Sequence, residues 1–341
     1  MKYMKKSFAG MEVYHSTLIT DGIILNANES PYQPPKKIIE LFNEAIKNIE
    51  FNRYPDMDER ELDQAIANHF GIDANCVTVG VGSDELLSST FRAVLEPGEK
   101  ILGFTPAFSM YKVFATLCGA IYEPVFGDEN MRFDIDDMIS KIKTSDAKAV
   151  VVCSPNNPTG QYFTEDEIRR LIESTDKLIL LDLAYINFSD NDYTKIAMEY
   201  DNVISYRTFS KDMALPSLRV GYAISNKENI DMINCIKDPY SVTTMSQIMA
   251  KIAIENVDLY KPQLELIKSE RTRVYNELKN MGFKVYPTQA NFIYMNMDDK
   301  YYQELLKNKI YIRRFKEGTY RPCVGTKEEN DKFLEVLRNA K

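Results

Sequence analysis

The pattern of hydrophobic and polar positions changes along the chain, and its middle part alternates short apolar runs with amphipathic segments. Residues 147–153 form a nearly continuous apolar run, typical of a strand buried on both faces of a parallel sheet. Similar apolar runs, separated by segments of helical periodicity, occupy residues 77–80, 100–104, 120–125, 178–182, 203–209 and 220–225. Strands that alternate with helices predict an α/β fold with a mostly parallel central sheet flanked by helices.

The pattern differs on both sides of this middle part. Residues 244–281 read as strongly helical, and the last sixty residues alternate short strands with helices, as in a small α+β domain. We therefore predict four parts: an N-terminal arm with part of a small domain, a large domain, a connecting helical segment and a C-terminal small domain. Their predicted bounds are residues 1–50, 51–240, 241–280 and 281–341.

Composition and charge exclude several classes of protein. Hydrophobic residues make up 44% and charged residues 27% of the 341 residues, as in soluble globular proteins, and no run approaches the length of a membrane helix. The net charge of −8 argues against a nucleic-acid partner. Five cysteines without a CxxC motif indicate free thiols in the cytoplasm, and two histidines that are far apart indicate that there is no metal site.

Chemically useful side chains follow the predicted strands of the middle part. Asp182 ends the run 178–182, and Asn157 comes shortly after the run that ends at Cys153, so both fall at carboxyl ends of strands, where α/β folds bind ligands. Tyr185 and Lys211 follow in order. A lysine amine can bind an aldehyde covalently, and a carboxylate can keep a pyridine nitrogen protonated. Together these groups match the reactive handles of pyridoxal phosphate.

A phosphate and an aromatic ring also have candidate partners. Small residues at the start of a predicted helix would direct backbone N–H groups at a phosphate, and hydroxyls and an arginine would add to them. These candidates are Ser83, Asp84, Thr208, Ser210 and Arg219. Phe108 is the candidate for stacking on the ring, with Tyr111 as the alternative.

These segments resemble a known family. The blocks SPNNPTG at 154–160, DLAY at 182–185 and SK at 210–211, with Arg219 eight residues after the lysine, are similar to those of the class I/II aminotransferases of pyridoxal-phosphate fold type I. Within that family, NANE at 26–29, RYPD at 53–56 and VGTKEEN at 324–330 resemble the histidinol-phosphate aminotransferases most. The resemblance covers roughly residues 23 to 338 and implies a large and a small domain like those of aspartate aminotransferase.

The resemblance implies roles for the cofactor-binding residues. Lys211 would hold the pyridoxal phosphate aldehyde and shuttle a proton. Asp182 would pair with the ring nitrogen, while Asn157 and Tyr185 would contact the phenolic oxygen. The phosphate would be held by Ser83, Asp84, Thr208, Ser210 and Arg219. Phe108 would stack on the ring, and the peptide bond before Pro158 would be cis.

The resemblance also implies a homodimer and a set of substrate contacts. Tyr54 would reach the phosphate of the cofactor in the neighbouring subunit. The substrate-binding candidates are Arg321, which would hold a carboxylate or its polar equivalent, together with Asn28, Tyr32 and Arg313. The chain departs from the subfamily's pattern at Leu183, Pro216 and Pro322, and these departures concern the substrate side more than the cofactor side.

We therefore expect a cytoplasmic, pyridoxal-phosphate-dependent aminotransferase that acts on small molecules. The expected reaction transfers the amino group of L-histidinol phosphate to 2-oxoglutarate, in histidine biosynthesis. Two alternatives share the cofactor: an aromatic or broad-specificity aminotransferase, and an enzyme like threonine-phosphate decarboxylase. A non-catalytic sensor that binds the cofactor is the alternative from another class, and no basic or DNA-binding segment supports it.

Overall fold

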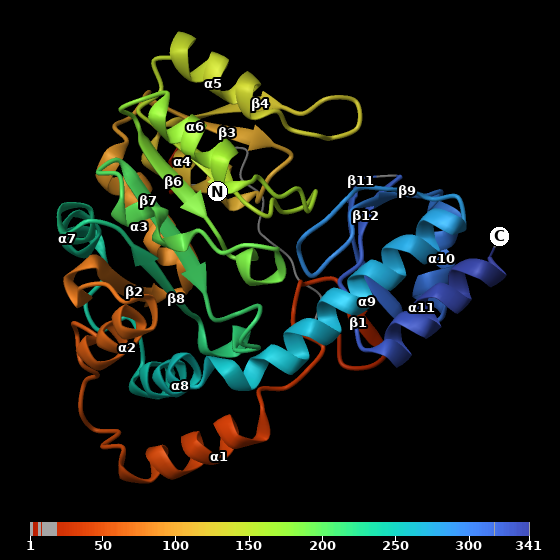
Figure 1. Cartoon of the computed structure of the whole chain (residues 1–341), viewed down its shortest axis with the longest axis horizontal. Coiled ribbons are helices and arrows are strands. Elements are labelled where there is room, and N and C mark those ends of the chain that lie inside the picture. Colours follow the sequence, from red (N-terminus) through yellow and green to blue (C-terminus); the bar gives the residue numbers. More distant parts are fainter. Residues whose placement is uncertain (1–2, 6–7, 9–18, 317, 341) are drawn as a thin grey trace.

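Two β-sheets, each with its own helices, are bridged by one long helix (Figure 1). The computed structural model describes residues 3–5, 8, 19–316 and 318–340. The larger sheet has seven strands in the order β2-β8-β7-β6-β5-β3-β4. Their bounds are β2 (Val77–Val81), β3 (Lys100–Thr105), β4 (Ile121–Phe126), β5 (Ala149–Cys153), β6 (Leu178–Asp182), β7 (Val203–Thr208) and β8 (Val220–Ile224). Only β8 runs antiparallel to its two neighbours, so the predicted mostly parallel α/β sheet is confirmed.

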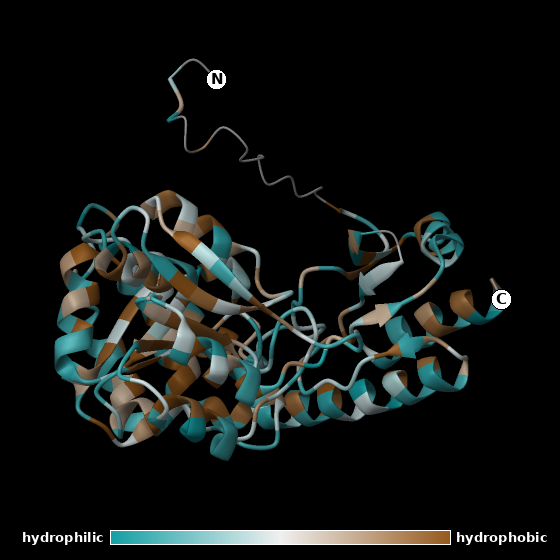
Figure 2. Ribbon diagram, turned by 90° about the horizontal axis from the view of Figure 1, so that it is seen from above, coloured by the Kyte–Doolittle hydropathy of each residue, from teal (hydrophilic) through white to brown (hydrophobic). Residues whose placement is uncertain are grey.

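Helices cover both faces of the larger sheet, which explains why its central strands are apolar on both sides. Along β5, Val150 and Val152 pack into one apolar core, whereas Ala149 and Val151 pack into the other. Figure 2 shows these hydrophobic strands lying between helices with hydrophilic outer faces. The helices are α2 (Arg60–Phe70), α3 (Gly82–Val94), α4 (Met110–Cys118), α5 (Ile135–Thr144), α6 (Glu165–Glu173), α7 (Lys227–Ile236) and α8 (Thr244–Glu255).

The smaller sheet joins the two ends of the described chain. Its order is β1-β11-β12-β10-β9, and β1 (Ile23–Leu25) pairs in parallel with residues 310–312 of β11. The other elements of this part are β9 (Lys284–Val285), β10 (Met295–Asn296), β11 (Ile310–Lys316), β12 (Thr319–Arg321), α9 (Lys261–Asn280), α10 (Asp299–Lys307) and α11 (Lys327–Asn339). Between β1 and the larger unit, α1 (Lys36–Ala45) packs against α8. The predicted domain bounds themselves stay a prediction.

Local sequence signals explain where several elements begin and end. The segment 244–281 is strongly helical as predicted, and a 3₁₀ turn (Val257–Tyr260) separates its two helices, α8 and α9. Asn256 turns its side-chain amide back onto the Ile252 carbonyl at 2.8 Å, and Pro262 stands in the first turn of α9, where a missing N–H costs little. Thr164 and Glu167 form a capping box at the start of α6, so the side chain of each satisfies the backbone N–H of the other.

Further short 3₁₀ turns lie at Ile46–Asn48, Ala74–Cys76, Ile186–Phe188, Thr194–Met198 and Pro216–Leu218. The Asn157–Pro158 bond is cis as predicted, and the bonds before Pro106 and Pro155 are cis too.

Among the described residues there is no helix with the length and apolarity to cross a membrane. The same residues contain no group of three or more histidine, cysteine or acidic side chains suited to a metal ion.

Candidate active site

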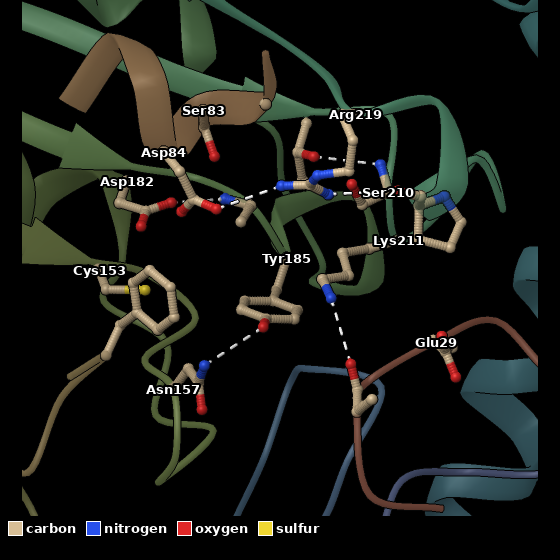
Figure 3. Close-up of a pocket in the computed structure, with 16 residues that line it drawn as sticks. Glu29, Ser83, Asp84, Cys153, Asn157, Asp182, Tyr185, Ser210, Lys211 and Arg219 are labelled. Carbon is tan, nitrogen blue, oxygen red and sulfur yellow. Dashed lines mark hydrogen bonds and ion pairs between the residues drawn. The ribbon is translucent and has the colours of Figure 1, made fainter. Parts of the chain in front are cut away.

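A cavity opens at the carboxyl edge of β5, β6 and β7, where the sequence predicted a site (Figure 3). Because these strands are parallel, the residues that follow each of them meet at one edge of the sheet. Ten of the predicted site residues line this cavity: Ser83, Asp84, Phe108, Asn157, Asp182, Tyr185, Thr208, Ser210, Lys211 and Arg219. The fold thus brings together groups that lie up to 136 positions apart in the sequence (219 − 83).

One end of the cavity is built to hold an anion. Helix α3 starts directly after β2, and its first residue, Gly82, has a φ of +75°. A side chain at Gly82 would lie 2.9 Å from the Arg219 guanidinium, and one at Gly221 would lie 2.1 Å from the Ser83 backbone nitrogen. Both glycines therefore allow the helix N-terminus and the guanidinium to approach closely. Arg219 also forms an ion pair with Asp84 at 3.3 Å.

Two hydroxyls complete this anion-binding end. Thr208 is the last residue of β7, and its Oγ1 accepts a hydrogen bond from the backbone N–H of Ser210 at 3.1 Å. This short turn places both side chains in the cavity wall next to Lys211. A helix N-terminus, two hydroxyls and a guanidinium form the donor set that a phosphate monoester requires.

A buried carboxylate, that of Asp182, also faces the cavity. Asp182 is 4% exposed, and its Oδ1 accepts from the backbone N–H of Ala184 at 3.1 Å, while its Oδ2 accepts from the Tyr111 hydroxyl at 2.5 Å. Burial raises the pKa of Asp182 to about 6, although the Tyr111 hydrogen bond opposes this shift. Sequence reasoning considered Tyr111 only as a stacking ring and missed its contact with Asp182.

The floor of the cavity is a chain of polar contacts around Tyr185. The Tyr185 hydroxyl accepts hydrogen bonds from the amides of Asn28 at 2.9 Å and Asn157 at 3.3 Å. Arg321 donates to the Asn157 side-chain oxygen at 2.5 Å, and its guanidinium lies over the Phe292 ring. Burial raises the pKa of Tyr185, so the hydroxyl stays neutral and can donate its own proton to an acceptor in the cavity.

Lys211 projects from the loop after β7 into the middle of the cavity (Figure 3). Its Nζ lies 3.4 Å from the Ala27 carbonyl oxygen and 5.9 Å from the centroid of the Tyr185 ring. Burial lowers the pKa of this amine to about 8. At pH 7, roughly a tenth of the amine is therefore neutral and nucleophilic, compared with less than a thousandth for an unshifted lysine.

A second, larger cavity with a volume of about 870 Å³ opens on the far side of Lys211. Three of the predicted substrate-binding residues line it, namely Asn28, Arg313 and Arg321. Arg313 and Arg321 are direct register partners on β11 and β12, so two guanidinium groups lie side by side in the smaller sheet. The sequence did not single out Glu29 and Phe315, which also belong to this wall.

Two predicted site residues lie outside both cavities. Tyr54 is 82% exposed, and its ring stacks on Tyr240 at 4.8 Å between centroids. Tyr32 packs against the apolar cluster around Tyr185 instead of lining a cavity. The roles predicted for these two residues stay predictions, as do the individual roles of the residues that line the cavities.

The donor set fits pyridoxal phosphate. The two glycines leave an anion cradle in the first cavity, and the buried Asp182 carboxylate faces the same cavity. Tyr185 and Asn157 offer neutral donors in this cavity, and Lys211 offers an amine with a lowered pKa. Each reactive handle of the cofactor therefore has a partner of the appropriate chemistry.

Comparisons with known proteins agree with this geometry. The chain is 33% identical over 343 aligned positions to a histidinol-phosphate aminotransferase of Thermoanaerobacter sp. strain X514, covering 98% of this chain and 97% of the relative. It is 32% identical over 329 positions to an aromatic amino acid aminotransferase of Cutibacterium acnes, covering 94% and 93%.

The fold also matches a solved structure, the histidinol-phosphate aminotransferase from Sinorhizobium meliloti in complex with pyridoxal-5'-phosphate. The TM-score is 0.86 at 20% identity, covering 100% of this chain and 99% of the other. The family model for aminotransferases of class I and II matches residues 20–337. The chain therefore belongs to the class I and II aminotransferase family, whose members use pyridoxal phosphate as their cofactor.

Proposed function

We propose that this protein transfers the amino group of L-histidinol phosphate to 2-oxoglutarate, a reaction of histidine biosynthesis, as a cytoplasmic homodimer. The observation that carries this proposal is the position of Lys211, whose side chain lines both the cofactor cavity and the larger cavity beside it. An amino donor in the larger cavity would thus meet the amine and the cofactor at the same point.

The residues around the cofactor would divide the work as follows. When bound, pyridoxal phosphate supplies an electron-withdrawing ring that labilises the α-hydrogen of an amino donor. Asp182 would hold its negative charge against the ring nitrogen, and Tyr185 would donate to the phenolic oxygen. Lys211, with a pKa near 8, would accept the α-proton of the donor at Nζ. The same amine would then return this proton to the carbon of the cofactor.

The substrate side supports a donor with an anionic group. Arg313 and Arg321 stand next to each other on paired strands and line the larger cavity. Two guanidinium groups suit a phosphate monoester, and they also suit the carboxylates of 2-oxoglutarate when the second substrate enters. The two arginines would therefore bind first the amino donor and then 2-oxoglutarate, the amino acceptor.

The proposed homodimer explains an exposed aromatic surface. Tyr54 is 82% exposed and Tyr240 is 44% exposed, and their rings stack with centroids 4.8 Å apart. Large exposed aromatic side chains that cluster in this way mark association surfaces. In the proposed dimer, Tyr54 would extend from this surface to the cofactor phosphate of the other subunit.

An aromatic amino acid aminotransferase is the second candidate, because the Cutibacterium acnes relative is nearly as similar as the first. A donor screen with 2-oxoglutarate decides between them. The proposal expects kcat/KM for L-histidinol phosphate to exceed that for L-phenylalanine and L-aspartate by at least about tenfold. A preference for phenylalanine would replace it with the second candidate, and carbon dioxide released from O-phospho-L-threonine would indicate a decarboxylase instead.

A further inference from the structure

Glu29 is an acidic residue in the cavity wall that none of the site predictions assigns. Its side chain is exposed, and Glu29 lines both the cofactor cavity and the larger cavity. In Figure 3 it lies on the far side of Lys211 from Asp182, on the segment that follows β1. Glu29 thus stands at the junction of the two cavities, where the side chain of an amino donor would lie.

The larger cavity is lined by both carboxylates and guanidinium groups, which come from different elements of the fold. Its described lining contains two carboxylates, Glu29 and Asp84, and Asp84 is paired with Arg219. Among the described residues, the Glu29 carboxylate makes no hydrogen bond or ion pair. The two arginines, Arg313 and Arg321, come from β11 and β12. The cavity therefore presents one available carboxylate and a separate pair of cations.

Two neutral amides of the lining, those of Asn28 and Asn157, are already engaged. The Asn28 amide donates to the Tyr185 hydroxyl, and its oxygen accepts from the Cys323 thiol at 3.2 Å. The Asn157 amide donates to the same hydroxyl and its oxygen accepts from Arg321. Glu29 adds a negatively charged acceptor to this region.

We propose that Glu29 determines donor specificity: its carboxylate accepts a hydrogen bond from an N–H of the donor's side-chain ring while the arginines bind the donor's anionic end. A ring with an N–H, such as imidazole, satisfies both sites, whereas a phenyl ring leaves the carboxylate facing an apolar surface. This inference rests on the proposed function and extends it to the choice between heteroaromatic and purely aromatic donors. A donor with a phenyl ring would bind more weakly, because it would bury the Glu29 carboxylate without a hydrogen-bond partner.

Two unreactive ligands test the inference by binding alone. The first is 3-(imidazol-4-yl)propyl phosphate, and the second is 3-phenylpropyl phosphate; they share the phosphate and differ in the ring. Isothermal titration of the holoenzyme gives the Kd of each. We expect the wild type to prefer the imidazole ligand and Glu29→Gln to lose about 10- to 100-fold in affinity for it, the range of a charge-assisted hydrogen bond. The affinity for the phenyl ligand should change less than about threefold.

A matched control and a conservative variant make the result specific. Glu129→Gln removes the same charge from an exposed residue that lines neither cavity, and should leave both Kd values unchanged. Glu29→Asp keeps the charge and should recover part of the imidazole preference. The expected kinetic counterpart in Glu29→Gln is a raised KM for L-histidinol phosphate with a smaller change in kcat.

The outcomes separate this inference from the proposed function. If Glu29→Gln retains the imidazole preference of the wild type, or weakens both ligands equally, Glu29 does not select the ring and the inference is wrong. If the wild type turns over phenylalanine better than L-histidinol phosphate, the proposed function is wrong, whatever the two Kd values show. If neither phosphate ligand binds to the wild type, both are overturned.

Discussion

Replacing Tyr111 with phenylalanine should move the pH range in which the protein binds its cofactor. The Tyr111 hydroxyl donates to the buried Asp182 carboxylate at 2.5 Å, and Tyr111 itself is 1% exposed, so water cannot replace the lost donor without repacking. A hydrogen bond to a charged group contributes about 1.5–3 kcal/mol, and one pKa unit corresponds to about 1.4 kcal/mol. Tyr111→Phe should therefore raise the pKa of Asp182 by about one to two units above its present value of about 6.

The direction in which the pH dependence of cofactor affinity shifts follows from the ionisation state of Asp182 that binds the cofactor. Asp182 must be ionised to pair with a protonated ring nitrogen, so affinity is lost as the pH falls through its pKa. With a higher pKa, Tyr111→Phe should lose affinity at a higher pH than the wild type. The two proteins should bind equally well at pH 9 and differ by about tenfold at pH 6, as follows from the ionised fractions of a group with pKa about 6 and one with pKa about 7.5.

The assay is a titration of the cofactor-free protein with pyridoxal phosphate, followed by absorbance between pH 5.5 and 9. Tyr122→Phe is the matched control, because this substitution also removes a hydroxyl that donates a hydrogen bond. The Tyr122 hydroxyl donates to the Phe104 carbonyl at 2.6 Å, and Tyr122 lines neither cavity. The control should follow the wild-type curve. If Tyr111→Phe also follows it across the whole pH range, the hydrogen bond does not tune Asp182 and the reasoning fails.

Three further predictions concern other parts of the site. The rate at which the cofactor-free protein captures pyridoxal phosphate should rise with pH to a plateau with a midpoint near 8, since burial lowers the pKa of Lys211; a midpoint near 10 would contradict this. Gly221→Ala should lower both thermal stability and cofactor affinity, because its Cβ would lie 2.1 Å from the Ser83 nitrogen; unchanged melting and binding curves would show that the α3 N-terminus moves freely. Tyr54→Ala should weaken cofactor retention, because Tyr54 would reach the cofactor phosphate of the other subunit in the proposed dimer; a fully active monomer would refute the shared site.

The cofactor side of the site was predictable because its residues are tied to strongly patterned strands. Asp182 ends an apolar run and Asn157 closely follows another, so hydrophobic patterning alone placed both at the carboxyl edge of the sheet. The structure has β5 and β6 parallel and adjacent, with Cys153 opposite Asp182. Lys211 and Arg219 follow β7 and precede β8 in the same way. The identities and order of these residues then indicated the cofactor.

The role of Tyr111 could not be predicted because it depends on where one helix begins. A helix starting at Phe108 would place Phe108 and Tyr111 on the same face, three residues apart, and both would then compete to stack on the ring. The observed α4 starts at Met110, so Phe108 belongs to the preceding loop, and the two rings meet edge to face at 85°. Phe108 lines the cavity while Tyr111 lies beneath it, against Asp182.

The substrate side depends on contacts between the two ends of the chain, which no local pattern encodes. β1 pairs with β11 in the register Ile23 to Ile310, and this pairing carries Asn28 and Glu29 to the cavity that Arg321 lines. The cofactor residues Asp182 and Lys211, by contrast, belong to the larger sheet. In the proposed reaction, the donor would meet Arg313 and Arg321 of the smaller sheet, so substitutions at these strands would change the choice of donor while preserving the chemistry at Lys211. Such a separation would account for the nearly equal similarity of this chain to a histidinol-phosphate aminotransferase and to an aromatic amino acid aminotransferase.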